Sequence, residues 1–366
     1  MAAKKSGKKG AGGFWVNGGL IIICLLWTIP TLGLLISSFR DRVDINRTGW
    51  WTVLPHQDWV ASEQIKPEPG VDRNQPMTLA GVTATFEEFR QGIEQDGKRL
   101  IWIGNRRVGY LEVQEQKITA NTNFTLENYK QVLASDDYTA TLSDGTTVTE
   151  RGDNMGRTFL NSLAVAIPAT IIPIFLAAMA AYGFAWMRFP ARKMSFALVI
   201  ALLAVPLQIA LVPLLRDYVA LGINGTFLAV WVAHTGFGLP LATYLLYNYI
   251  SGLPRDILES SFIDGASHFT IFMKHILPLS VPALAAFAIF QFLWVWNDYL
   301  VALIFIGASP TNQVLTQRLA EIVGSRGQDW HLLTAGAFVT MLLPLAVFFG
   351  LQRFFVRGLL AGSVKG

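Results

Sequence analysis

One polar stretch of the sequence, residues 258–284, lies between two long apolar runs and carries side chains that could bind another molecule. Its chemically distinctive residues are two acids, two histidines, a lysine and a glycine: Glu259, Asp264, Gly265, His268, Lys274 and His275. Their spacing does not match a nucleophile–base pair or a metal site. The stretch is therefore a candidate binding element, and its local structure decides what it can bind.

The start of this stretch has the signals of a short helix. Pro254 suits the first helical turn, and Asp256 and Glu259 favour its positive N-terminus. Gly265 stands where a helix end commonly needs left-handed dihedral angles, and a second amphipathic turn follows over residues 269–276. We expect a helix–glycine–helix element, which is suited to insertion into a groove on a partner protein. A solvent-exposed connector is the alternative.

A second group of polar residues lies within an apolar run further along the chain. Gln291, Trp294 and Asp298 are spaced i, i+3 and i+7, which places them on one face of a helix, and Asn297 precedes Asp298. An aromatic ring beside hydrogen-bonding groups suits a polyhydroxylated ligand, because the apolar faces of a sugar stack on indole. This face is a candidate substrate path. Alternatively, these groups and His234 only bond to neighbouring helices.

Motifs for phosphate or metal chemistry are missing from the 366 residues. The sequence has no glycine-rich phosphate loop and no His-Glu-x-x-His. The only cysteine is Cys24, and the five histidines are scattered. We therefore expect no catalytic residue, no metal and no cofactor, so that any nucleotide energising transport is bound by another chain. An intramembrane hydrolase using Asp298 and His234 is disfavoured, because these residues lie on different apolar runs.

The composition is that of a membrane protein. Hydrophobic residues make up 52% of the chain and charged residues 15%, whereas soluble domains carry about 25% charged residues. The net charge of +4 is spread along the chain, which does not suggest nucleic-acid binding. Crossing the hydrocarbon core takes about 20 apolar residues in a helix. Six windows satisfy this requirement: residues 19–39, 159–186, 195–215, 226–249, 279–306 and 332–352.

The distribution of basic residues predicts an orientation. The first window follows four lysines, but no small-residue cleavage site appears before Arg40, so we interpret it as a retained helix, with a cleaved signal as the alternative. Short loops on the side of the N-terminus carry more Lys and Arg per residue than those on the other side. This bias predicts that both termini and residues 250–278 are cytoplasmic.

The long polar segment between the first two windows, residues 40–158, has the pattern of a small α+β domain. Residues 99–115 read as two β-rich runs around a polar turn, and residues 138–150 alternate on both sides of an Asp-Gly pair, which predicts a hairpin. Residues 85–97 and 125–133 each contain a short helical pattern. An ordered but irregular loop is the alternative.

The polar stretch described first resembles the coupling-loop signature of ABC-importer permeases, Glu-Ala-Ala-x-x-x-Gly followed by Leu-Pro. The matching residues are Glu259 to Gly265 and the pair at 277–278. The sequence departs from the signature at Ser260 and Ser261, where alanines are usual, and at His275, where isoleucine is usual. Serine in place of alanine is sterically mild, whereas the larger and polar His275 puts the packing at its own position in question.

Other segments are similar to the carbohydrate branch of this family, and specifically to its second, maltose-permease-like subunit. These segments are residues 159–170, 181–192, 290–305 and 352–366, and residues 125–133 resemble the segment that this family carries just ahead of its second span. The length of the outer insertion resembles that of the α-glucoside permeases. The resemblance covers residues 120–366 closely and 14–39 loosely.

The resemblance implies an all-α polytopic membrane protein with the six transmembrane helices of a type I ABC importer and a small α+β extracytoplasmic insertion. The implied division is a cytoplasmic N-terminus with the first helix, the insertion, a permease core and a cytoplasmic tail. These parts are residues 1–39, 40–158, 159–352 (with a coupling loop at 250–278) and 353–366.

The resemblance further implies a sugar permease of the bacterial inner membrane that has no ATPase site of its own. Its partners would be a second permease subunit in a heterodimer, two ATPase subunits that bind ATP, and an extracytoplasmic sugar-binding protein. The positions implied to contact the ATPase are Glu259, Ser260, Ser261, Asp264, Gly265, Ala266, Leu277 and Pro278. The alternative is an ion-coupled secondary transporter, for which only Asp298 and His234 could serve as intramembrane ion ligands.

Overall fold

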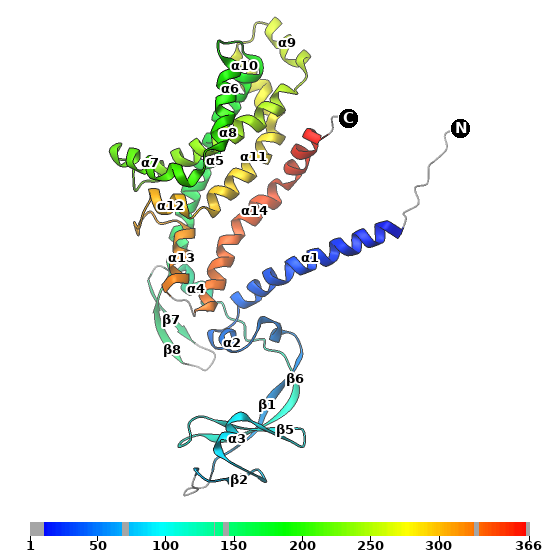
Figure 1. The fold of residues 1–366 in the computed structure, drawn as a ribbon, viewed down its shortest axis with the longest axis vertical. Helices are drawn as coiled ribbons and strands as arrows, with labels where there is room; N and C mark the ends of the chain where they lie inside the picture. Colours follow the sequence, from blue (N-terminus) through cyan, green and yellow to red (C-terminus); the bar gives the residue numbers. More distant parts are fainter. Residues whose placement is uncertain (1–10, 68–72, 135, 142–145, 326–328, 364–366) are drawn as a thin grey trace, which may run out of the picture. The chain divides into compact units, whose positions relative to one another are not determined.

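The computed structural model describes residues 11–67, 73–134, 136–141, 146–325 and 329–363. The chain divides into two compact units (Figure 1). The first comprises Met1–Arg42 and Thr125–Gly366, and the second comprises Val43–Phe124. The separately packed part of the insertion is therefore shorter than residues 40–158.

The helices of the first unit are drawn in Figure 1. Their bounds are α1 (Ala11–Ser38), α4 (Glu127–Leu133), α5 (Met155–Trp186), α6 (Arg192–Ala201), the 3-10 turn η2 (Leu202–Ala204), α7 (Leu207–Ala220), α8 (Phe227–Ser251), α9 (Arg255–Ile263), α10 (His268–Ile271), the π turn η3 (Phe272–Ile276), α11 (Leu277–Asn297), α12 (Leu300–Phe305), α13 (Leu315–Ser325) and α14 (Trp330–Ser363). Since α14 continues through Ser363, the helix runs on past residue 353, where a separate tail was expected.

Among the described residues, five helical segments are long and apolar enough to cross a membrane. They are Trp15–Ser38, Met155–Trp186, Phe227–Ser251, His268–Asn297 and Trp330–Phe354. A sixth span results if the bent pair Arg192–Ala204 and Leu207–Ala220 is counted as one. The predicted all-α polytopic fold with a small sheet insertion is confirmed.

The third predicted window, residues 195–215, is not one straight helix. The helical segments Arg192–Ala204 and Leu207–Ala220 are bent by 103° relative to each other. Val205 is extended, with ψ 117°, and Pro206 is the N-cap of α7. Proline disfavours helical dihedrals at the residue before it and has no N–H for the ladder. The prolines at 168 and 173, by contrast, lie inside the continuous helix α5.

The fifth predicted window, residues 279–306, was wrong at both ends. The helical segment starts earlier, at His268, and α11 ends at Asn297. Asp298 is extended, with ψ 118°, and a separate short helix, α12, begins at Leu300. Asp298 therefore leaves the helix face that carries Gln291 and Trp294, although the i, i+3, i+7 spacing predicted that all three share one face.

Small residues let α5 and α8 pack closely. Ala177, Ala178 and Ala181 of α5 and Ala242 of α8 are fully buried in one cluster. The same cluster includes Leu258 of α9, so α9 is anchored to the core of helices. Without a hydrophobic driving force between helices in lipid, such close van der Waals contact is a main source of association.

Helix α4 joins the first unit through its polar residues. The Asn128 side-chain amide donates to the carbonyl oxygens of Ser38 and Arg40, both at 2.9 Å. The Tyr129 hydroxyl lies 2.6 Å from Ser38 Oγ. Burial raises the pKa of the Tyr129 phenol above its ordinary value. These bonds fix the junction between the end of α1 and the start of the helical core.

The predicted hairpin at residues 138–150 is confirmed by its strands. β7 (Asp137–Thr141) and β8 (Thr147–Arg151) pair antiparallel, with Thr141 opposite Thr147. The Asp-Gly pair itself lies outside the described residues. Both strands belong to the first unit, and β7 contacts α4.

The second unit is a four-stranded antiparallel sheet in the order β1-β6-β5-β4. Its elements are α2 (Arg42–Arg47, which begins at the last residue of the first unit), η1 (Trp50–Val53), β1 (His56–Ile65), β2 (Met77–Leu79), β3 (Val82–Ala84), α3 (Phe86–Gln91), β4 (Ile93–Gln95), β5 (Lys98–Ile103) and β6 (Tyr110–Thr119). The two β-rich runs predicted at residues 99–115 are β5 and β6, so that prediction is confirmed.

Helix α3 begins with a complete capping box. Thr85 Oγ1 accepts a hydrogen bond from the Glu88 backbone, and the Glu88 carboxylate accepts one from the Thr85 backbone at 2.7 Å. This backbone bond lowers the pKa of the Glu88 carboxyl below its ordinary value. Phe89 is completely buried against β5 and β6, together with Leu111. The short helix predicted within residues 85–97 is thus confirmed.

Candidate functional site

The polar stretch around Gly265 forms two short helices joined by a left-handed residue. Gly265 has φ +76°. Its N–H donates to Phe262 O at 3.0 Å, and the Ala266 N–H donates to Ser261 O, also at 3.0 Å. These two bonds are the Schellman pattern that ends a helix. The predicted helix–glycine–helix element is confirmed, and we call residues 254–278 the coupling element.

The second helix of the coupling element has its own cap. Ser267 Oγ accepts a hydrogen bond from the Thr270 N–H at 3.2 Å. α10 then continues through η3 directly into α11, so the element is joined to a membrane-spanning segment without an intervening loop. A displacement of the element is therefore transmitted to α11 through a continuous helical backbone.

The coupling element has a buried side and an exposed side. Leu258 is fully buried, and Ser261 is buried next to it on the helix face. Glu259, Ser260, Asp264 and Gly265 are exposed. The apolar side chains of Ile263 and Phe269 are 85% and 67% exposed. An exposed apolar surface beside acidic groups is what docking into a groove requires.

Two of the positions that depart from the family signature contact each other. Ser261 Oγ lies 3.3 Å from His275 Nε2, which joins α9 to η3 across the glycine turn. Near this pair, the Tyr182 hydroxyl of α5 lies 2.9 Å from His268 Nδ1. The Ser261–His275 contact thus joins the two helices of the element, and the Tyr182–His268 contact joins the element to the helical core. Sequence reasoning noted Ser261 and His275 separately and missed that they form a pair.

Removing either side of the Ser261–His275 bond is expected to have the same effect as removing both. A typical hydrogen bond contributes about 1 kcal/mol. Ser261→Ala and His275→Leu should therefore each lower the melting temperature of the purified chain, and the double variant should lower it little further, because contacting residues are not additive. Ser260→Ala is the matched control, since within the described residues its exposed hydroxyl bonds to Ile257 O of its own helix alone. Fully additive shifts would contradict the pairing.

The second predicted group divides into residues with different surroundings. Gln291 is 2% exposed, and its amide donates to Ala169 O at 3.1 Å and to His234 O at 3.4 Å. It therefore connects α11 to α5 and α8. A Cβ added at Gly238 would lie 2.6 Å from Gln291 Oε1, so glycine is what permits this close approach.

Asp298 holds the break between α11 and α12. Its Oδ1 accepts a hydrogen bond from the Val301 N–H at 2.9 Å, and its backbone carbonyl accepts one from Thr316 Oγ1 at 3.0 Å. Its Oδ2 lies 3.7 Å from His234 Nε2, and both side chains are buried. The rings of Trp294 and His234 pack edge to face, with 4.9 Å between their centroids. His234 thus contacts both Trp294 and Asp298, which are bonds between neighbouring helices of the kind that the alternative expects; the substrate path stays a prediction.

Asn297 is the most exposed of the four predicted residues. Its amide donates to Leu293 O of its own helix at 2.8 Å. A small cavity of about 10 Å³ lies beside Asp298 and His234 and is also lined by Ser162 and Trp296. This volume is comparable to one water molecule. A sugar could therefore occupy this place only after the surrounding helices move.

Comparison with known proteins places these features in a family. The model of the family described as "Binding-protein-dependent transport system inner membrane component" matches residues 163–360. The chain belongs to this family. The matched region includes the whole coupling element and the break at Asp298. Recognition of the chain as a permease subunit of ABC importers is thereby confirmed, and this decides against the ion-coupled secondary transporter.

Two relatives of this inner-membrane component are similar over nearly its whole length. The "Alpha-glucoside transport system permease protein AglG" of Rhizobium meliloti is 46% identical over 384 aligned positions, covering 96% of this chain and 97% of the relative. The "Osmoprotective compounds uptake permease protein GgtD" of Synechocystis is 46% identical over 356 positions, covering 96% and 93%. Such coverage includes most of the outer insertion.

A solved structure supports the fold of this inner-membrane component. A chain of the bacterial ABC transporter involved in the import of the acidic polysaccharide alginate aligns with a TM-score of 0.60 and 12% sequence identity. The alignment covers 96% of this chain and all of the other. At this identity the likeness establishes the shared fold alone.

Proposed function

We propose that the chain is the membrane-spanning subunit of an importer for a sugar of the α-glucoside class or a related oligosaccharide. The observation that carries this proposal is the 46% identity with the α-glucoside permease over 96% of the chain. The equally similar relative named for osmoprotective compounds is compatible with a small polyhydroxylated solute. Trp294 and Asp298, beside His234, supply the ring and acceptor groups that such a solute binds.

The proposed energy source is ATP hydrolysis on two separate ATPase subunits, since the sequence has no phosphate loop. The coupling element would dock into a groove on one ATPase subunit. Its proposed contacts are Glu259, Ser260, Asp264 and Gly265 on the exposed side, with Ile263 and Phe269 as apolar contacts. Ser261, Ala266, Leu277 and Pro278 would hold the element in shape.

The proposed assembly further contains a second permease subunit and an extracytoplasmic sugar-binding protein in the bacterial inner membrane. The coupling element and both termini would then be cytoplasmic, and the second unit would lie on the outer side. The excess of basic residues in the corresponding loops supports this orientation.

Uptake by intact cells tests the proposed substrate class. Cells lacking this chain should lose ATP-dependent uptake of a labelled α-glucoside such as maltose, trehalose or sucrose, and the chain expressed from a plasmid should restore it. A binding protein that co-purifies with the chain should hold the same sugar. Restored uptake of a solute without hydroxyl groups, with no uptake of any sugar, would contradict the substrate class.

Deleting most of the second unit tests its role in docking the binding protein. Removal of residues 60–117 leaves two ends, Trp59 and Ile118, that lie close together, because Ile118 pairs with Gln57 in the sheet. We expect binding-protein docking to weaken at least tenfold while the chain still inserts in the membrane. The measurement is binding-protein affinity for the reconstituted complex. Unchanged docking together with unchanged uptake would remove the proposed role.

A further inference from the structure

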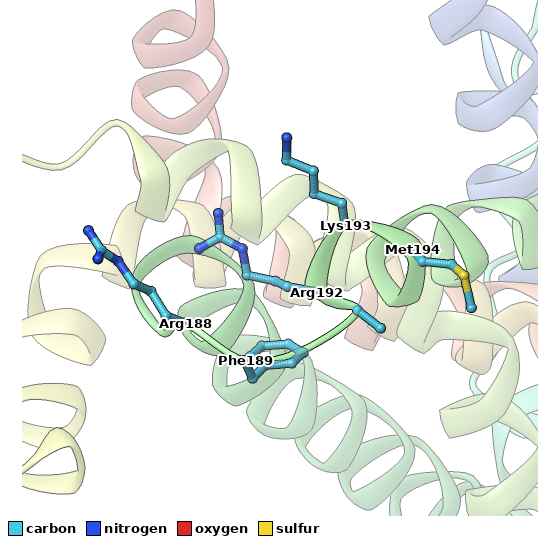
Figure 2. Close-up of a pocket in the computed structure, with 6 residues that line it drawn as sticks. Arg188, Phe189, Arg192, Lys193 and Met194 are labelled. Carbon is cyan, nitrogen blue, oxygen red and sulfur yellow. The ribbon is translucent and has the colours of Figure 1, made fainter.

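The turn between α5 and α6 gathers basic side chains around a surface hollow (Figure 2). The hollow is lined by Arg188, Phe189, Ala191, Arg192, Lys193 and Met194. Three of these six side chains are cationic. A surface hollow of this composition attracts an anionic group.

Acidic residues are missing from the stretch of sequence around this turn. The sequence has no Asp or Glu between Asp153 and Asp217. In the described parts of the chain, none of the three cationic groups forms an ion pair. The guanidinium of Arg192 donates to Met187 O at 2.9 Å, which is a neutral acceptor. The positive charge of the hollow is therefore available to an anionic group from outside the chain.

The turn is built so that its charges lie together. Ala191 has φ +59°, and the bond from Arg192 to Met187 O closes the turn around it. In Figure 2 the ends of Arg192 and Lys193 extend to the same side of the turn, and the Phe189 ring lies on the other side. The hollow thus has a cationic side and an apolar side.

The position of the turn in the fold is that of a membrane boundary. The membrane-spanning segment α5 ends at Trp186, only a few residues before the turn, and aromatic residues are enriched at the headgroup level. The side chains of Phe189 and Met194 are 42% and 74% exposed. Exposed apolar side chains directly beside cations fit a molecule that is anionic at one end and apolar at the other.

We propose that this turn binds an anionic phospholipid of the adjacent leaflet. Arg188, Arg192 and Lys193 bind its phosphate, and Phe189 and Met194 contact the start of an acyl chain. An acidic protein surface would satisfy the charges but would leave these two apolar side chains uncovered. The proposal is independent of the imported solute and of the orientation of the chain.

Lipid binding to the full-length chain tests the proposal. The chain is purified in neutral detergent and titrated with phosphatidylglycerol or phosphatidylcholine, and bound lipid is measured by native mass spectrometry. The test variant is Arg188→Gln/Lys193→Gln, which keeps Arg192 and its bond to the turn. The matched control is Arg90→Gln/Lys117→Gln, which removes two exposed positive charges from the second unit. Arg188→Lys/Lys193→Arg retains both charges and reports on folding of the turn.

Wild type should bind phosphatidylglycerol in preference to phosphatidylcholine. Each basic residue near an anionic lipid contributes about fivefold in affinity, so the test variant should bind phosphatidylglycerol about 25-fold more weakly. The control and the charge-retaining variant should bind like wild type. Unchanged binding in the test variant would overturn the proposal. Displacement of the lipid by millimolar inorganic phosphate would also overturn it. So would a test variant that binds lipid normally but no longer associates with the ATPase subunits.

Discussion

Gly265→Pro is expected to abolish uptake while the chain still inserts in the membrane. Proline fixes φ near −65°, whereas this residue has φ +76°. The substitution also removes the Gly265 N–H that bonds to Phe262 O at the end of α9. The exposed face of α9 would then be directed away from the groove proposed on the ATPase subunit. The measurements are sugar uptake and the stimulation of ATP hydrolysis by the binding protein, and both should fall to background.

A matched substitution separates backbone geometry from side-chain contact. A Cβ at Gly265 would meet no atom within 4 Å, so the site tolerates a side chain sterically. Asparagine adopts left-handed dihedrals more readily than other non-glycine residues. Gly265→Asn should therefore retain most of the uptake. Normal stimulation of ATP hydrolysis in Gly265→Pro would contradict the assignment of this element to ATPase coupling.

Asp298→Ala is expected to lower the stability of the chain by about 2 kcal/mol, because a buried hydrogen bond to a charged group is worth about 1.5–3 kcal/mol. The bond that is lost is the one from the Val301 N–H, and His234 loses its neighbouring carboxylate. Asp298→Asn keeps an acceptor oxygen and should cost less. The measurements are the melting temperature of the purified chain and the half-saturating sugar concentration for uptake.

Asn297→Ala is the control for this effect, since the hydrogen bond that its side chain forms to the part of the chain described by the structure lies within its own helix. It should leave the melting temperature nearly unchanged. If Asp298→Ala raises the half-saturating sugar concentration while the melting temperature stays unchanged, Asp298 contacts the substrate. If it lowers the melting temperature at an unchanged half-saturation, its role is confined to holding the helix break.

Local signals predicted the coupling element well. Gly265 was recognised because a helix end followed by glycine is defined by a few consecutive residues. The capping box of Thr85 and Glu88 and the strands around residues 104–109 are equally local. Of the positions that the coupling-loop signature specifies, Glu259, Ser260 and Gly265 are exposed and Ser261 is buried; their contact with an ATPase stays a prediction.

Features that depend on tertiary contacts were not predictable. The bond between Ser261 and His275 joins residues fourteen positions apart, and only the turn at Gly265 brings them together. The end of α11 at Asn297 was missed because the apolar run continues beyond it. Prolines in α5 remain helical while Pro206 breaks its helix. Such differences depend on which neighbouring groups accommodate each proline.

The bend at Pro206 has a consequence for what surrounds the chain. At the end of a helix the last backbone carbonyls lack intrahelical donors. Here the Val205 N–H bonds to Leu202 O at 3.1 Å, and any carbonyl that stays unpaired in hydrocarbon would cost several kcal/mol. Leu202, Leu203 and Val205 are 51%, 43% and 52% exposed, so the chain leaves this corner uncovered. Lipid tails cannot donate hydrogen bonds to backbone carbonyls at this corner. If this pair crosses the bilayer as one span, the backbone carbonyls at the bend need water or a second protein beside them. The bend is then a place where the surface of the chain is not in contact with lipid.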